Sequence, residues 1–175
     1  MSISGEVRQI IRQRAHYACE FCGVTETDAC GELTIDHFHP QTKGGTDILE
    51  NLLYCCYRCN QYKADYWPTQ PNEPHLWHPQ HEPIERHLLL LAAGTLHPIT
   101  EVGVFTLQRL RLNRPPLVAL RLRKQKETLE YRLLARYHDL VAVLAQLHRQ
   151  QVALLEEQQA LLAEQRRLVQ LLLQR

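Results

Sequence analysis

Four cysteines near the start of the chain have the spacing of a metal site. The sequence contains six cysteines, all within its first 60 residues, and four of them form two C-x-x-C pairs, Cys19 with Cys22 and Cys56 with Cys59. Each C-x-x-C turn presents two sulfurs to one side of an ion, and a structural Zn²⁺ takes four ligands in a tetrahedron. We therefore expect these thiolates to hold a structural zinc ion rather than form the disulfides of a secreted protein.

The other two cysteines are not assigned to the metal. Cys55 competes with Cys56, but only Cys56 lies at the x-x spacing from Cys59. Cys30 has no partner at ligand spacing, and we interpret it as a buried or loop thiol. The alternative for the whole set is a group of buried free cysteines.

A second group of polar residues lies between and just after the cysteine pairs. In chain order it comprises Asp36-His37, Gly44-Gly45, Asn51-Leu52, Asn60 and Lys63. Taken with the two cysteine pairs, this order resembles the HNH endonuclease family, whose nuclease domain is a ββα-metal finger. The resemblance covers roughly residues 7–66. Each motif alone is degenerate, and only their joint order is specific.

The resemblance implies that these residues hydrolyse a DNA phosphodiester bond. His37 would be the general base, because imidazole titrates near neutral pH. Asp36 and Asn60 would hold a catalytic ion, and oxygen ligands suit Mg²⁺ or Mn²⁺ better than Zn²⁺. Asn51 would hold the loop backbone that directs His37, and Lys63 would contact phosphate. Many family members have a histidine where this chain has Asn60, so this is an HNN variant and the identity of the metal stays open.

Each of these residues also has a simpler interpretation. An Asp-His pair can be an ordinary strand end, an asparagine a loop cap and a lysine a solvated charge. For the chain as a whole, the alternatives are a non-catalytic zinc module that binds nucleic acid or protein, and a nuclease subunit of a larger targeting or antiviral defence complex. A decayed enzyme is expected to have lost Asp36, His37 or Asn60, and all three remain. RNA and single-stranded DNA stay open as substrates.

Short elements are expected to position these residues. Apolar residues at helical spacing predict a helix over residues 5–18, and residues 33–37 and 52–55 are typical of short strands. A second helix is expected from about residue 57 to residue 66. A ββα unit of this size has little core, so the zinc ion would contribute directly to its folding free energy. We expect an HNH nuclease domain over residues 1–67 within an α+β protein.

Residues 68–114 are expected to form a linker followed by a small mixed extension. The linker is rich in Pro and His. Its histidines His75, His78 and His81 have a metal-like spacing, but the prolines among them oppose a helix that would present all three. A structural linker is therefore favoured over a metal site. A helix is expected near residues 101–112.

The end of this extension is basic. Residues 98–114 resemble, less closely than the finger does, an extension that follows the finger in one bacterial HNH subgroup. Arg109, Arg111 and Arg114 begin the densest basic stretch of the chain. These side chains would lie along a DNA backbone and give salt-dependent affinity. The equally supported alternative is a solvated helix surface.

Residues 115–175 predict a long helix. The segment begins with two prolines, which suit the first turn of a helix, and contains no proline or glycine after Pro116. Leucines recur every seven residues from Leu133 to Leu168. This periodicity predicts a coiled coil, and we expect a homodimer or a partner protein bound through residues 129–173. The alternative is a helical hairpin that folds back on its own domain.

Bulk composition limits the other function classes. The net charge is only +1, although residues 115–175 carry ten Lys or Arg against six Asp or Glu. Nucleic-acid binding must therefore be argued from a site rather than from overall charge. No apolar run approaches the roughly 18 residues that a membrane span needs. We expect a cytoplasmic protein that binds DNA and no membrane.

Overall fold

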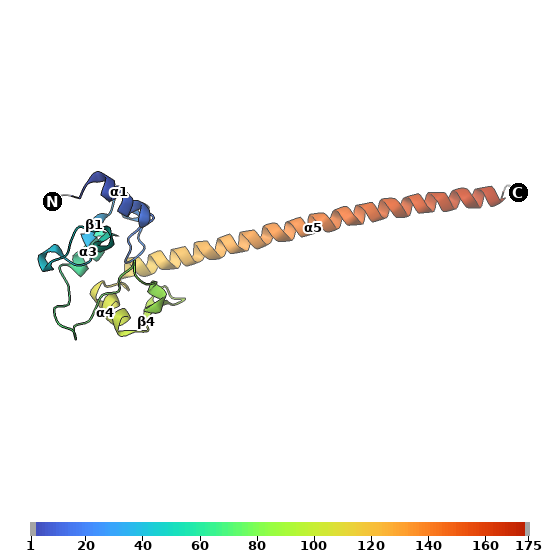
Figure 1. The fold of residues 1–175 in the computed structure, drawn as a ribbon. Helices are drawn as coiled ribbons and strands as arrows, with labels where there is room; N and C mark the ends of the chain where they lie inside the picture. Colours follow the sequence, from blue (N-terminus) through green and yellow to red (C-terminus); the bar gives the residue numbers. More distant parts are fainter. Residues whose placement is uncertain (1–2, 174–175) are drawn as a thin grey trace. The chain divides into compact units, whose positions relative to one another are not determined.

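The computed structural model describes residues 3–173 and has the α+β architecture expected from the sequence (Figure 1). In chain order the helices and strands are α1 (Gly5–Arg14), α2 (Glu26–Ala29), β1 (Thr34–His37), β2 (Leu52–Cys55), α3 (Tyr57–Lys63), β3 (Leu88–Leu90), β4 (Leu96–Pro98), α4 (Glu101–Arg109) and α5 (Pro115–Leu173). The chain divides into two compact units between Gln125 and Lys126. Among residues 3–173, no helix combines the length and the apolar character needed to cross a membrane.

The centre of the first unit is a two-stranded antiparallel sheet followed by a helix. Strands β1 and β2 pair with Asp36 opposite Leu53 and His37 opposite Leu52. All four residues of β2 are buried, whereas those of β1 are half-buried. Helix α3 begins directly after β2, and α1 is tied to β2 by Arg14, whose guanidinium donates to the carbonyl of Leu52 at 2.6 Å. The predicted ββα unit is therefore present.

Three helices end earlier than the sequence predicts, and one of them is α4, which ends at Arg109 rather than near residue 112. Helix α1 ends at Arg14, because His16 and Tyr17 adopt φ angles of 49° and 58°. Helix α3 ends at Lys63, because Ala64 has a φ of 51°. These φ angles lie in the left-handed region, which a right-handed helix cannot include. Apolar spacing does not report such a backbone change, so the expected ends at residues 18 and 66 were too late.

The Pro- and His-rich segment after α3 packs against the rest of the first unit as an irregular chain. Trp77 is buried, its backbone N–H donates to the hydroxyl of Thr106 on α4, and its indole N–H donates to the Glu82 carbonyl. The side chain of Gln80 donates to the Leu52 carbonyl of β2. This segment, residues 68–83, therefore connects the finger to the extension that follows.

The extension consists of the hairpin β3–β4, helix α4 and the first turns of α5. Gly94 in the hairpin turn has a φ of 75°, and a Cβ there would lie 2.7 Å from Leu122 Cγ, so no other residue fits without a shift. Leu110, Leu112 and Leu117 are completely or almost completely buried. The beginning of α5 is thus part of the core of the first unit.

The second unit contains only the remainder of α5. The helix is uninterrupted from Pro115 to Leu173, as the sequence predicts (Figure 1). From residue 126 to residue 170 every side chain is exposed, including the leucines of the seven-residue repeat. Residues 115–173 therefore form no helical hairpin.

Candidate active site and metal centre

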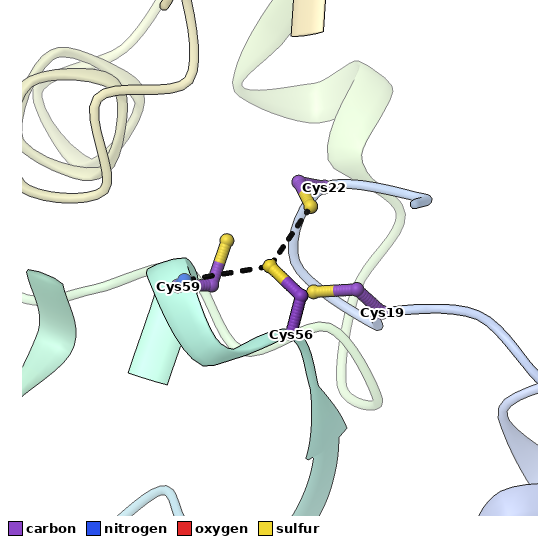
Figure 2. Close-up of side chains that lie close together, drawn as sticks. All are labelled: Cys19, Cys22, Cys56 and Cys59. Atoms are coloured by element: carbon purple, nitrogen blue, oxygen red, sulfur yellow. Dashed lines mark hydrogen bonds between the residues drawn. The ribbon is translucent and has the colours of Figure 1, made fainter. Parts of the chain in front are cut away.

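Two tight turns bring the four predicted cysteine ligands together. Cys19 and Cys22 flank a turn in which the N–H of Gly23 donates to the carbonyl of Cys19. Gly23 has a φ of 71°, which glycine adopts without strain. Cys56 is the N-cap of α3, and its sulfur accepts from the N–H of Cys59. The two pairs face each other in Figure 2.

The geometry of these sulfurs fits a tetrahedral zinc ion. All four lie within 4.8 Å of one another, and the sulfurs of Cys22 and Cys56 are 3.7 Å apart. A Zn–S bond of about 2.3 Å in a tetrahedron requires sulfurs about 3.8 Å apart. Hydrogen bonds from Cys19, Cys22 and Cys59 lower the pKa of the Cys56 thiol, whereas burial raises the pKa of the Cys19 thiol, so a bound cation is what would favour the thiolate at all four positions. Among the described residues, no other group of three or more His, Cys, Asp or Glu has such an arrangement.

The two remaining cysteines lie outside this cluster. Cys55 is fully buried in β2, and burial raises the pKa of its thiol, so the side chain behaves as a small apolar residue. Cys30 is exposed at the end of α2, where it adopts a φ of 57°. Sequence spacing therefore separated Cys56 from Cys55 correctly.

Arg114 contacts three of the four sulfurs. Its Nη2 lies 3.7 Å from the sulfur of Cys59 and 3.9 Å from those of Cys22 and Cys56. Four thiolates around one Zn²⁺ would leave a net negative charge, which the guanidinium beside them would offset. Nη1 of the same side chain donates to the Leu110 carbonyl. Arg114 thereby connects the cysteine cluster to the segment that leads into α5.

Asp36 lies on the face of β1 that α3 covers. Its Oδ2 is 2.9 Å from Nζ of Lys63, which is completely buried and also donates to the His37 carbonyl at 2.6 Å. Asn60, one turn before Lys63, donates to the hydroxyl of Thr34. Thr34 and Asp36 are two residues apart and so share a face of the strand. The amide of Asn60 and the carboxylate of Asp36, which is 17% exposed, therefore lie on the same side of β1.

His37, the last residue of β1, contacts a residue that was not expected from the sequence. Its Nε2 lies 2.6 Å from Oδ1 of Asp47, which also accepts from the side chain of Gln41. The hydrogen bond from His37 lowers the pKa of Asp47, so Asp47 is a carboxylate at neutral pH. Nδ1 of His37 has no hydrogen-bond partner within residues 3–173. The sequence signal that could have identified Asp47 is its position as an acidic residue in the loop that contains Gly44 and Gly45.

Asn51 holds the loop that follows His37. Its Oδ1 accepts from the N–H of His39 at 2.7 Å, and its Nδ2 donates to the carbonyls of His39 and Thr46. Gly45 lies against the same backbone, and a Cβ at this position would lie only 1.8 Å from the His39 carbonyl oxygen. These contacts fix the backbone on either side of the loop that carries Asp47.

The four predicted phosphate contacts occupy different environments. Lys63 is buried against Asp36 and His37, as described above. Arg109 lies over the ring of Tyr66 and donates to the Lys63 carbonyl. Arg111 is exposed and lies over the ring of Tyr62, with its guanidinium carbon 4.9 Å from the ring centre. Arg111 is thus the most accessible of the four cations, and Arg114 is engaged by the cysteines.

The family comparison agrees with this arrangement. The segment from residue 19 to residue 65 matches the family model described as HNH endonuclease. Residues 19–65 form an HNH domain. No curated protein and no solved structure matches the chain significantly. The match spans the cysteine cluster, Asp36, His37 and Asn60, which supports a nuclease or a nucleic-acid-binding zinc module.

Proposed function

We propose that this protein is a metal-dependent endonuclease that hydrolyses DNA phosphodiester bonds with His37 as the general base. The observation that carries this proposal is the 2.6 Å contact between Nε2 of His37 and Asp47. A carboxylate at Nε2 keeps the proton on that nitrogen, so the lone pair is on Nδ1. A non-catalytic zinc module does not require an imidazole arranged in this way.

In the proposed reaction, Nδ1 of His37 takes a proton from the water molecule that attacks the phosphorus. The imidazolium that forms is stabilised by the carboxylate of Asp47. Asp47 acts as a positioning residue, because it touches the base and not the substrate. Asn51 supports the same geometry by holding the backbone at His39 and Thr46.

A divalent ion would be held by Asp36, next to His37 in β1, and by Asn60 of α3. Both side chains offer oxygen ligands, and Mg²⁺ is commonly held by one or two protein ligands together with phosphate oxygens and water. When bound, Mg²⁺ or Mn²⁺ supplies Lewis-acid stabilisation of the phosphate and the leaving oxygen. Lys63 holds Asp36 and the His37 carbonyl from within the core, so it positions both parts of the site. We propose the exposed Arg111, together with the half-buried Arg109, as contacts to the DNA backbone.

Plasmid cleavage tests the catalytic proposal. Wild-type protein with Mg²⁺ or Mn²⁺ is expected to convert supercoiled DNA to nicked or linear forms, and His37→Ala is expected to abolish this. Asp47→Asn is expected to lower the rate while leaving DNA binding unchanged. His97→Ala, an exposed histidine of β4, is the matched control. Equal cleavage by wild type and His37→Ala would show that the reaction belongs to a contaminant and that the domain is a binding module.

We also propose that residues 129–173 pair with a second copy of this chain in a parallel coiled coil. Six leucines form one row of the helix: Leu133, Leu140, Leu147, Leu154, Leu161 and Leu168. A second row, four residues later in each repeat, contains Tyr137, Leu144, Gln151, Gln158 and Gln165. In heptad notation these are the d and a rows, and in this structure both are exposed.

The glutamines favour the parallel, in-register arrangement. In that arrangement each layer contains the same residue from both chains, so glutamine meets glutamine and both amides can form hydrogen bonds. In an antiparallel pair, a positions face d positions, and each glutamine would face a leucine and lose those bonds. Polar a positions are known to fix register at some cost in stability. Two copies would also provide two sites, one for each strand of a duplex.

Sedimentation of the full-length protein tests the dimer. A dimer is expected at micromolar concentration, and Leu147→Glu with Leu154→Glu is expected to give a monomer. Ala142→Glu with Ala163→Glu adds the same charge on the opposite side of the helix and is expected to leave the dimer intact. In a Cys30→Ser background, Leu133→Cys and Leu168→Cys should each form a disulfide with its own copy. A monomeric wild-type protein, or cross-linking only between the two different cysteines, contradicts the parallel dimer.

A further inference from the structure

A cavity of about 410 Å³ lies between the loop after β1 and the segment after α3. Its volume falls within the range of about 300–1,000 Å³ that is typical of small-molecule sites. The loop contributes Phe38, His39 and Ile48 to its lining, and the segment contributes Trp67, His78 and His81. Flat rings thus make up five of the ten residues that line the cavity.

The rings form two stacked pairs. His39 and Trp67 lie 3.8 Å apart with nearly parallel planes, and His78 and His81 are stacked at the same distance. Phe38 contacts Trp67 in an edge-to-face arrangement and lies 4.1 Å from His78. Phe38 thus connects the two stacks.

His78 is uncharged where the rings meet, and Glu50 is the one acidic residue in the cavity lining. Burial lowers the pKa of His78 to about 4, with smaller contributions from His81 and Arg14, so its imidazole is neutral at neutral pH. A flat, uncharged group can therefore contact it without meeting a desolvated cation. Ile48 is 57% exposed, and His81 is also exposed, so one apolar and one aromatic side chain remain accessible at the rim.

The cavity shares a residue with the candidate active site. Asn51 lines it and at the same time holds the backbone of His39, two residues beyond His37. A ligand in the cavity would therefore lie beside the loop that positions the proposed general base.

We propose that this cavity binds an unpaired nucleobase of the strand being cut, next to the scissile phosphate, so that the preferred substrate is single-stranded or locally unpaired nucleic acid. This inference rests on the proposed nuclease function and specifies its substrate class. Aromatic and histidine rings bind splayed-out bases by stacking, and such stacking tolerates every base because each has a π-face. A base within a duplex is stacked on its neighbours and cannot enter a pocket of this kind.

Binding to oligonucleotides with a single missing base tests the proposal. The full-length, zinc-loaded His37→Ala protein is titrated with single-stranded DNA in which an abasic site is moved one nucleotide at a time. One position is expected to weaken binding roughly 5- to 100-fold, the range for loss of one base–aromatic stack. 2-Aminopurine at that same position is expected to change its fluorescence on binding.

Rim variants show whether the effect arises in this cavity. In the same His37→Ala background, Ile48→Ala with His81→Ala is expected to weaken binding of the intact strand and to remove the penalty of the abasic site. Ile10→Ala with His97→Ala changes exposed residues of the same types elsewhere and should leave the penalty unchanged. Both pairs lie at exposed positions, so loss of folding does not complicate the comparison.

Cleavage by the active protein separates this proposal from the nuclease assignment. Faster cutting of single-stranded or mismatched DNA than of paired duplex supports the nucleobase site. Equal cutting of paired and unpaired DNA, with no position-dependent abasic penalty, overturns the nucleobase site and leaves the nuclease function standing. Absence of cutting on every substrate overturns the nuclease function, whereas the abasic series still shows whether the cavity takes a base.

Discussion

The two ends of α5 contain the same residue types in opposite environments. Leu117 and Leu120, in the first turns, are 2% and 8% exposed because they pack in the core of the first unit. Leu133 and Leu154, farther along the same helix, are 55% and 57% exposed. Local helix propensity does not distinguish the two stretches. Burial of a leucine stripe depends on what packs against it, and no other segment of the described structure covers the leucines between residues 126 and 170.

The two units of the chain also differ in what stabilises them. The first unit has a buried apolar core, two small sheets and a cysteine cluster, and each part contacts another part of the same chain. An isolated helix in water is only marginally stable unless its apolar face packs against another element. We therefore expect the first unit to respond to changes in its own core and metal, and the second to respond to protein concentration.

Removal of zinc is expected to have the largest effect, and to affect only the first unit. A structural zinc ion contributes about 10–16 kcal/mol of apparent binding free energy in small fingers. Chelation, or Cys22→Ser, is expected to unfold the finger, as seen in the fluorescence of Trp67 and Trp77. Cys30→Ser should be silent, because Cys30 is exposed and lies outside the cluster. Unchanged tryptophan fluorescence after complete zinc removal would show that the apolar core keeps the finger folded without zinc.

A matched pair of leucines compares the two units directly. Leu110→Ala is expected to destabilise the first unit by about 2–5 kcal/mol, the usual cost of truncating a fully buried leucine. Leu154→Ala is expected to leave the Tm of the first unit unchanged and to weaken only the proposed coiled coil. Thermal unfolding followed by tryptophan fluorescence, together with sedimentation, measures both effects. A lower Tm of the first unit in Leu154→Ala would contradict the view that the two units are stabilised independently.

Arg114 offers a smaller test within the first unit. Arg114→Gln is expected to lower zinc affinity about 10- to 100-fold, the range for groups that contact metal ligands. The zinc affinity of Arg114→Lys is expected to lie between those of wild type and Arg114→Gln, because an ammonium group keeps the charge but loses the planar guanidinium. Competition with a zinc-binding dye measures this. Arg111→Gln removes the neighbouring cation over Tyr62, which contacts none of the sulfurs, and serves as the control; an equal loss there would point to a general charge effect.

The smallest expected effect is on how the thermal stability of the first unit depends on pH. Hydrogen bonds from Arg12 and then from Tyr54 lower the pKa of Glu26 below its ordinary value of 4.5. The folded state therefore favours the carboxylate, and the resulting stability is present above pH 4.5 and lost as the pH falls through the folded-state pKa. The Tm of the zinc-loaded first unit should fall less steeply on acidification in Glu26→Gln than in wild type. Glu85→Gln, at an exposed glutamate, should follow the wild-type curve.

Much of the finger was predictable because its signals are local. The C-x-x-C spacing selected Cys56 over Cys55, and the order of motifs indicated the HNH domain that the family comparison shows. The ends of α1 and α3 were predicted too late, because the positive φ angles of Tyr17 and Ala64 do not change the spacing of apolar residues. Asp47 was missed because its role depends on the loop that Asn51 closes.

The basic residues show where sequence reasoning has least information. Lys63, Arg109, Arg111 and Arg114 look alike as cations in the sequence. The structure gives them four separate surroundings: a buried carboxylate, a tyrosine face with a carbonyl, an exposed position and a cluster of sulfurs. A cation is placed by whatever acceptor or ring the tertiary fold brings to it, and that partner is distant in sequence.

The sequence by itself determined the cysteine cluster, the HNH motif order, the α+β class and the helical character of the C-terminal segment. Each of these depends on spacing along a short stretch of chain. Only the tertiary structure decided which polar groups meet, namely His37 with Asp47, Asp36 with Lys63 and Arg114 with the sulfurs. It also brought the rings of residues 38–81 together around one cavity. These contacts join distant segments, and their positions are fixed by packing rather than by local propensity.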